Sequence, residues 1–170
     1  MFENFVNKVK HPFSSLCNTV MLETTLSARR HITMQQYNNF GTILLVDDHL
    51  SLLRSTAFLL DVTGFSVITA TNGAEALKLM ETCRPDFIIS DVDMPVMDGF
   101  DFLQAVRQDY RWRRIPFMFA SEQYELEDLL YGLDLGANDY IPKPFDIYDI
   151  LDGIQRTAPQ LIKSHHRMAS

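Results

Sequence analysis

The chain contains 170 residues, of which 46% are hydrophobic, so it is long enough for one domain with a substantial core and an additional segment. Its net charge of -7 and its pI near 5.1 argue against nucleic acid as a partner, because phosphate groups are bound by basic surfaces. Two cysteines are too few for a disulfide framework, and no apolar run is long enough for a signal peptide or a membrane span, so we expect a soluble, cytoplasmic protein.

The first 40 residues differ in charge from the rest of the chain. They carry two acidic and four basic side chains, a net charge of +2, whereas residues 41–160 carry 20 acidic and nine basic side chains, a net charge of -11. Apolar side chains recur in this segment at helical spacing, namely Phe2, Phe5, Val6, Val9, Leu16, Val20 and Met21. We therefore predict a helical N-terminal extension over residues 1–40, which either packs on its own domain, is partly disordered, or serves in docking or dimerisation.

From residue 41 to residue 158, short apolar segments alternate with amphipathic ones. The apolar segments predict strands at residues 42–46, 65–70, 87–90, 116–120 and 140–141. The amphipathic segments predict helices at residues 50–62, 74–82, 100–108, 124–135 and 145–157, followed by a tail over residues 159–170. Apolar strands joined by crossover helices indicate a five-stranded parallel sheet covered on both faces. With right-handed crossovers this is a doubly wound, three-layer α/β/α sandwich.

The third predicted strand ends abruptly in an acid. Asp91 follows a buried apolar run, and Pro95 and Gly99 mark the residues after it as a loop. A carboxylate in that position needs a partner or a ligand, because an unpaired charge in an apolar setting is costly. We expect Asp91 at the carboxyl end of a core strand, facing the crevice where open parallel sheets place their ligands.

Four more polar side chains follow other predicted strands. Asp47 and Asp48 come after the first strand, Ser121 after the fourth and Lys143 after the fifth, so one edge of the sheet should collect them with Asp91. Carboxylates that lie this close repel one another unless a cation neutralises them, and Mg²⁺ prefers carboxylate oxygens, carbonyl oxygens and water. Asp91 is then a candidate nucleophile toward phosphorus, with Lys143 and Ser121 as partners of phosphoryl oxygens.

These segments together resemble the receiver domain of two-component response regulators over about residues 41–158. The matching motifs are LVDDH at 45–49, NGAEAL at 72–77, DVDMPVMDG at 91–99, IPFMFAS at 115–121 and GANDYIPKPF at 136–145. The resemblance implies a flavodoxin-like sheet with the strand order 2-1-3-4-5. It also implies a non-enzymatic signalling module, apart from self-catalysed phosphotransfer and autodephosphorylation.

The resemblance assigns roles to individual residues. Asp91 would accept a phosphoryl group from a sensor histidine kinase or a histidine phosphotransfer protein, and Lys143 would contact that group. Asp47, Asp48 and Asp91 would hold Mg²⁺ together with the backbone carbonyl of Asp93. Ser121 and Tyr140 would form a switch pair, in which phosphorylation draws Ser121 toward the phosphoryl group and lets Tyr140 turn inward. The remodelled face would comprise helix 124–135, strand 140–141 and helix 145–157, and would bind a downstream protein. The chain is also compatible with a homodimer.

Two residues depart from the usual receiver pattern. The residue after the switch hydroxyl is usually small, and here it is Glu122. A carboxylate there, and another at Asp93, should modulate access of phosphodonors and of hydrolytic water to an anionic site. We expect no effector domain after the segment that contains Phe145, and we interpret His165-His166 in the tail as a solvated end.

Two other classes of protein are compatible with parts of the sequence. A receiver fold can serve as an interaction module that does not depend on phosphorylation, although the complete set of Asp91, Lys143 and Ser121 argues against it. The Asp91-Val92-Asp93 motif also resembles the nucleophile motif of haloacid-dehalogenase-type phosphatases. Those enzymes place the motif after their first strand and lack an upstream acidic pair.

Overall fold

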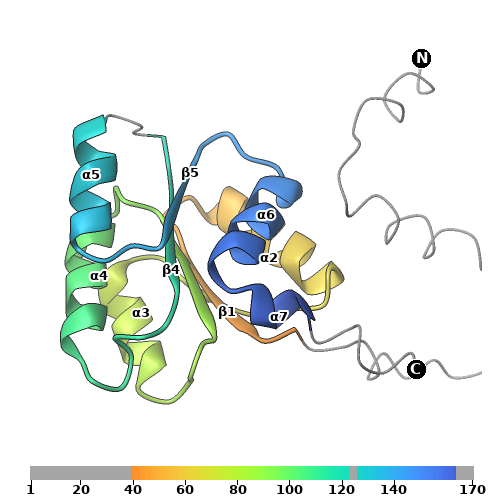
Figure 1. Ribbon diagram of the computed structural model, residues 1–170, viewed down its shortest axis with the longest axis horizontal. Helices are drawn as coiled ribbons and strands as arrows, with labels where there is room; N and C mark the ends of the chain where they lie inside the picture. The colour runs from red at the N-terminus through yellow and green to blue at the C-terminus, as the bar shows by residue number, and fades with distance from the viewer. Residues whose placement is uncertain (1–39, 123–125, 164–170) are drawn as a thin grey trace, which may run out of the picture. The chain divides into compact units, whose positions relative to one another are not determined.

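The computed structural model describes residues 40–122 and 126–163 (Figure 1). The predicted helical extension and the His165-His166 pair therefore lie outside the described residues, except for Phe40. Among the described residues, no helix is both long enough and apolar enough to cross a membrane.

Five parallel strands form one sheet in the order β2-β1-β3-β4-β5, as the sequence predicted. The strands are β1 (Thr42–Val46), β2 (Ser66–Ala70), β3 (Phe87–Ser90), β4 (Phe117–Ser121) and β5 (Asp139–Pro142). Every residue of β3 and β4 is buried, because helices cover both faces of the sheet at these strands. This burial explains their continuous apolar sequence.

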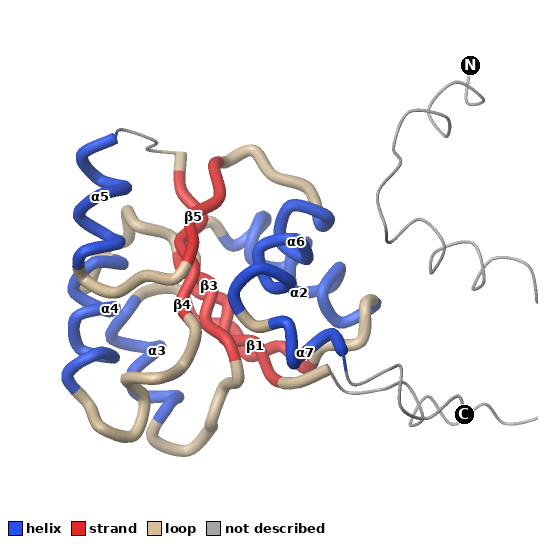
Figure 2. The backbone as a smooth tube through the Cα atoms, viewed as in Figure 1, coloured by secondary structure: helices blue, strands red, loops and turns tan. Residues whose placement is uncertain are grey.

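The helices are α2 (Leu50–Val62), α3 (Gly73–Met80), α4 (Gly99–Gln108), α5 (Leu126–Asp134), α6 (Ile147–Thr157) and α7 (Pro159–Lys163). Figure 2 shows α3, α4 and α5 on one face of the sheet and α2 and α6 on the other. The domain formed by the described residues is therefore a three-layer sandwich. Four fully buried phenylalanines are among the largest core side chains, namely Phe87, Phe102, Phe117 and Phe119.

Some predicted boundaries were wrong at the carboxyl-terminal end of the domain. The last long helix begins at Ile147 instead of residue 145, because the Asp146 carboxylate caps it by accepting hydrogen bonds from the backbone N–H groups of Tyr148 and Asp149. The fifth strand covers Asp139–Pro142 instead of residues 140–141, since its pairing with β4 extends to both ends. Within the predicted tail, Pro159–Lys163 form a short helix, and a proline suits its first position because the N–H there has no helical partner.

A half-buried arginine that the sequence analysis did not single out connects elements at the opposite edge of the sheet. Arg107 on α4 donates hydrogen bonds to the carbonyl oxygens of Gly136 (3.0 Å) and Ile115 (2.9 Å) and to the Asn138 side chain (3.1 Å). Burial lowers the pKa of this guanidinium below its usual value. Asn138 in turn accepts a hydrogen bond from the backbone N–H of Phe117, so α4 and the starts of β4 and β5 are connected.

The loop after β3 closes tightly on itself at Gly99. The backbone N–H of Gly99 donates to the carbonyl oxygen of Val92 (2.8 Å), which returns the chain next to Asp91. A Cβ atom at Gly99 would collide with the carbonyl oxygen of Asp91 and lie 2.9 Å from the Cα atom of Val92. Both neighbours are backbone atoms, so they have little freedom to move aside.

We predict that Gly99→Ala lowers the free energy of unfolding by about 1–3 kcal/mol, because the added methyl group displaces backbone in a packed interior. Urea denaturation followed by circular dichroism measures this effect. Gln104→Ala on the exposed side of the same helix is the control and should change stability by less than about 0.5 kcal/mol. Equal stabilities of the two variants would contradict the close approach at Gly99.

Candidate functional site

The polar residues that follow β1, β3 and β5 lie at the same edge of the sheet. Backbone hydrogen bonds continue past the strand ends, from Asp47 N–H to the carbonyl of Ala70, from Asp91 N–H to that of Val46, and from Lys143 N–H to that of Ser121. These bonds fix the backbone of all three residues to the neighbouring strands. The structure thus brings Asp47, Asp91 and Lys143 together, as the strand pattern predicted.

The Lys143 ammonium bridges the two buried carboxylates. Its Nζ atom lies 2.7 Å from Oδ2 of Asp47 and 2.7 Å from Oδ2 of Asp91. The three side chains are only 6–7% exposed, so solvent screens this cluster weakly. Two carboxylates and one ammonium leave a net negative charge in the cluster.

Burial shapes the protonation of this cluster. Burial raises the pKa of Asp91, although the hydrogen bond from Lys143 works in the opposite direction. Burial alone would lower the pKa of Lys143, but hydrogen bonds to Asp47 and Asp91 outweigh it and the pKa is raised. The lysine is therefore a permanent cation at neutral pH, and Asp91 is a carboxylate whose negative charge is disfavoured by its surroundings.

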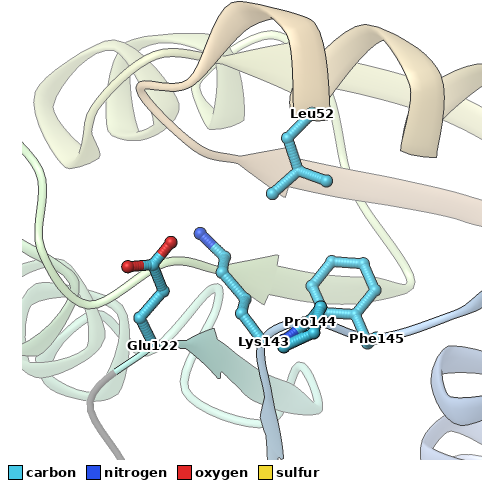
Figure 3. Close-up of a pocket in the computed structure, with 5 residues that line it drawn as sticks. All are labelled: Leu52, Glu122, Lys143, Pro144 and Phe145. Carbon is cyan, nitrogen blue, oxygen red and sulfur yellow. The ribbon is translucent and has the colours of Figure 1, made fainter.

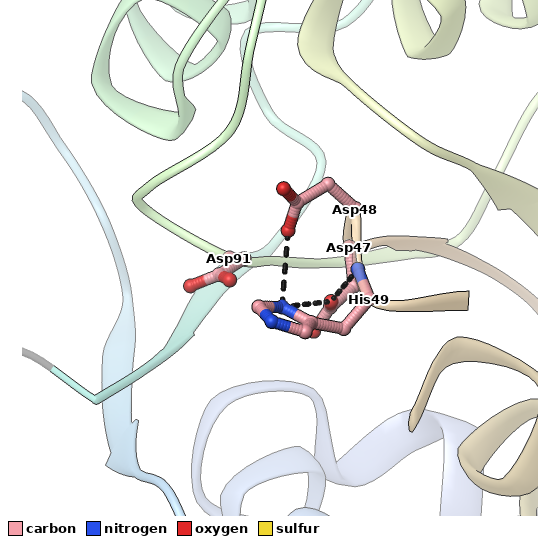
Figure 4. Close-up of side chains that lie close together, drawn as sticks. All are labelled: Asp47, Asp48, His49 and Asp91. Carbon is pink, nitrogen blue, oxygen red and sulfur yellow. Dashed lines mark hydrogen bonds and ion pairs between the residues drawn. The ribbon is translucent and has the colours of Figure 1, made fainter. Parts of the chain in front are cut away.

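The second acid of the pair, Asp48, has an unsatisfied atom. Its Oδ1 atom is shielded from solvent and accepts no hydrogen bond from any described residue, although Nδ1 of His49 lies 3.1 Å away. Figure 4 shows Asp47, Asp48, His49 and Asp91 around one small region, and one ligand atom from each lies within 4.8 Å of the others. A buried oxygen without a donor is costly and suits a cation. The carboxylate set therefore fits a hard divalent metal ion.

The two predicted switch residues are both buried. Ser121 is 1% exposed and Tyr140 is 7% exposed, and the two side chains share a hydrogen bond. Burial raises the pKa of the Tyr140 phenol, while the bond with Ser121 opposes this effect. The Tyr140 ring lies 5.7 Å from that of Phe119, centroid to centroid. The structure holds the Tyr140 ring inside, and the role of Ser121 and Tyr140 as a switch pair stays a prediction.

Glu122 stands at the mouth of the site. It lines an open pocket of about 390 Å³ together with Leu52, Lys143, Pro144 and Phe145 (Figure 3). The Glu122 side chain is exposed, and so is that of Asp93 on the loop after β3. A small molecule that approaches Lys143 through this pocket therefore passes a carboxylate.

A family model of the response regulator receiver domain matches residues 43–155. The chain belongs to this family. Receiver domains are in general signalling modules of two-component systems that are phosphorylated by histidine kinases.

Curated relatives are longer than the matched segment. The chain is 41% identical over 103 residues to the alkaline phosphatase synthesis transcriptional regulatory protein PhoP of Bacillus subtilis, which covers 61% of this chain and 42% of that protein. It is 38% identical over 109 residues to the transcriptional regulatory protein PrrA of Mycobacterium tuberculosis, covering 64% and 46%. The chain thus spans less than half the length of these relatives.

Solved structures confirm the fold. The chemotaxis response regulator CheY4 of Vibrio cholerae aligns with a TM-score of 0.65 and 36% identity, over 69% of this chain and 98% of that one. The receiver domain of the sensor histidine kinase PA1611 of Pseudomonas aeruginosa aligns with a TM-score of 0.64 and 29% identity, over 69% and 96%. That structure contains a magnesium ion coordinated in its active-site cleft.

One residue at the site was missed by sequence reasoning. His49 was quoted only as part of the acidic motif, yet its imidazole lies beside both carboxylates of the pair, with Nδ1 3.7 Å from Oδ1 of Asp47. His49 comes directly after Asp47 and Asp48 and directly before a predicted helix, and this position indicates that its side chain stays near the acidic pair. A residue there begins a turn and remains near the two side chains that precede it.

We predict that Asp91→Asn raises the stability of the chain at neutral pH. The raised pKa means that the folded state binds the Asp91 proton more tightly than the unfolded chain does, so this group's contribution to stability is full below its unfolded value and is lost as pH rises through the folded pKa. The uncharged amide removes that loss. Thermal melts of both proteins between pH 3.5 and pH 7.5 should converge toward the acid end. A variant less stable than the parent at pH 7.5 would contradict this electrostatic account.

Proposed function

We propose that Asp91 accepts a phosphoryl group from a phosphohistidine, on a sensor histidine kinase or a histidine phosphotransfer protein. A carboxylate oxygen of Asp91 forms a bond to phosphorus while the bond from phosphorus to the donor imidazole nitrogen breaks, and the leaving imidazole takes up a proton. The observation that carries this proposal is the Lys143 ammonium held 2.7 Å from Asp91. It places a cation beside the acceptor oxygen, where the incoming phosphoryl oxygens gather negative charge.

The divalent ion that we assign to this site is Mg²⁺. Asp47, Asp48 and Asp91 would hold it, with the backbone carbonyl of Asp93 as a further ligand, and it would supply neutralisation of the phosphoryl charge. The unsatisfied Oδ1 atom of Asp48 supports this assignment. The magnesium ion in the PA1611 receiver domain is consistent with it.

The output that we propose is a change in a protein-binding face formed by α5, β5 and α6. Support comes from the exposed apolar side chains of α5, which are Leu126, Leu130, Tyr131 and Leu133. Tyr131 packs edge-on against Phe100, with ring centroids 5.0 Å apart, so this face is in contact with the start of α4. The named relatives are transcriptional regulators, but they extend well beyond the matched segment, and no DNA binding is carried over from them.

The rival function is an interaction module that does not depend on phosphorylation. It requires neither a cation beside Asp91 nor an unsatisfied oxygen on Asp48. Both features are costly in a purely structural site, because each desolvates a charged group. The phosphorylated module is therefore the better account of these residues.

We expect Asp91→Asn to abolish labelling by acetyl phosphate or phosphoramidate in the presence of Mg²⁺, because the amide has no nucleophilic carboxylate. Intact-protein mass spectrometry measures the added phosphoryl group. Asp134→Asn, a matched substitution at an exposed position of α5, is the control and should label like the parent chain. Stoichiometric labelling of the Asp91 variant would show that the acceptor lies elsewhere.

We also expect Glu122→Ala to speed labelling by small anionic donors. Removing a carboxylate from the mouth of the pocket lowers the repulsion of a dianionic donor, and salt screens exposed charges over about 8 Å at physiological ionic strength. The gain in rate should therefore be largest at low salt and should shrink as salt is added. Glu122→Gln separates charge from size, because it retains the length of the side chain. If Gln leaves the rate at the parent value while Ala raises it, the effect is steric.

A further inference from the structure

We propose that His49 is a metal-specificity residue, which adds an imidazole nitrogen to the carboxylates of Asp47, Asp48 and Asp91 and makes the site favour Zn²⁺ over Mg²⁺. The inference rests on the proposed function, because it concerns the same metal position. It goes beyond that function in naming a ligand and a class of ion that would compete with Mg²⁺ for the acceptor site.

The distance between two side-chain atoms carries the argument. Nδ1 of His49 lies 3.1 Å from Oδ1 of Asp48, and no hydrogen bond joins them. Two neighbouring ligands, each at the usual bond length of about 2.1 Å, are about 3 Å apart around an octahedral ion and about 3.4 Å apart around a tetrahedral one. The 3.1 Å distance between the two atoms is close to the spacing of neighbouring ligands, and it is also that of an ion pair if the imidazole is protonated. Figure 4 shows the imidazole turned toward the acidic pair instead of away from it.

The remaining ligand atoms are close enough to share the same ion. One atom from each of Asp47, Asp48, His49 and Asp91 lies within 4.8 Å of the others, and opposite ligands of an octahedral ion are about 4.2 Å apart. Small rotations of side chains close this difference. The His49 side chain is 67% exposed, so it has room to rotate.

The chemistry of the ligand atoms determines which metal ion binds more tightly. Imidazole suits Zn²⁺ and other late first-row metals, whereas Mg²⁺ takes oxygen ligands and releases water reluctantly. Adding one nitrogen donor to a carboxylate site therefore raises its affinity for Zn²⁺ far more than its affinity for Mg²⁺. Zn²⁺ bound in this way occupies the position that the phosphotransfer reaction needs.

A competing role for His49 is that of a counter-ion. A protonated imidazole 3.1 Å from Asp48 would neutralise the acidic pair and would oppose every divalent ion alike. The two roles give opposite results when the side chain is removed. Loss of a ligand weakens Zn²⁺ binding selectively, while loss of a counter-ion strengthens the binding of both ions.

Isothermal titration of the full chain with Zn²⁺ and with Mg²⁺, at one fixed pH and with reduced cysteines, measures the ratio of the two affinities. We expect His49→Ala to lower the ratio of Zn²⁺ to Mg²⁺ affinity about tenfold or more, since even an outer partner of a metal ligand is worth that much. His49→Arg keeps a cation but has no lone pair, so it should lower the ratio similarly. In ¹⁵N-resolved imidazole spectra, Zn²⁺ should shift the Nδ1 signal that is missing from the His49 variants.

The double variant His165→Ala/His166→Ala is the control for zinc bound by the histidine pair near the end of the chain. Zinc affinity that disappears in this variant and persists in His49→Ala would overturn the proposal, as would a ratio that His49→Ala leaves unchanged or a rise in both affinities. Failure of the proposed function is distinguishable, because the parent chain would then fail to bind Mg²⁺ and Asp91→Asn would still be labelled.

Discussion

The two 2.7 Å contacts of the Lys143 ammonium hold the functional edge of this molecule together. They join the ends of β1, β3 and β5, which approach one another only in the folded sheet. Without the ammonium, two buried carboxylates would face each other at a cost of several kcal/mol. The negative charge that remains after this pairing is what makes the site receptive to a further cation.

That bridge depends on backbone that is fixed nearby. The backbone N–H of Asp91 donates a hydrogen bond to the carbonyl oxygen of Val46, and on the other side the chain returns close to Asp91 at Gly99. At the opposite edge of the sheet, Arg107 donates hydrogen bonds to carbonyl oxygens in two loops. These bonds connect α4 to the starts of β4 and β5. The contacts around Asp91 and those of Arg107 both involve backbone atoms, so they directly constrain the positions of the strands.

The sequence predicted the sheet and most of its site because both follow from local patterns. The parallel sheet and the meeting of Asp47, Asp91 and Lys143 follow from apolar runs that end in polar residues, whereas the strand order followed from the resemblance to receiver domains. The start of α6 was wrong because Asp146 and Asp149 satisfy each other in a capping box, which outweighs the helical spacing of Phe145. The contacts of Arg107 and of His49 are tertiary. The contacts of Arg107 depend on loops that are far apart in the sequence. The contacts of His49 depend on the conformation of the turn before α2, which sets the direction of its imidazole.

The buried position of Tyr140 bears on the expected switch, in which phosphorylation would turn this ring inward. If the ring is inside in the unmodified chain, a phosphoryl group that favours the inside position moves only the fraction of molecules whose ring is still outside. A ligand that binds one of two states about 5.5 kcal/mol more tightly shifts their ratio from 1:99 to 99:1. If most molecules already have the Tyr140 ring inside, the same preference changes the populations little. If Asp91 is phosphorylated as proposed, the contrast between the resting and signalling states would come from Ser121, which would exchange its hydrogen bond with the Tyr140 phenol for one with an oxygen on the modified aspartate.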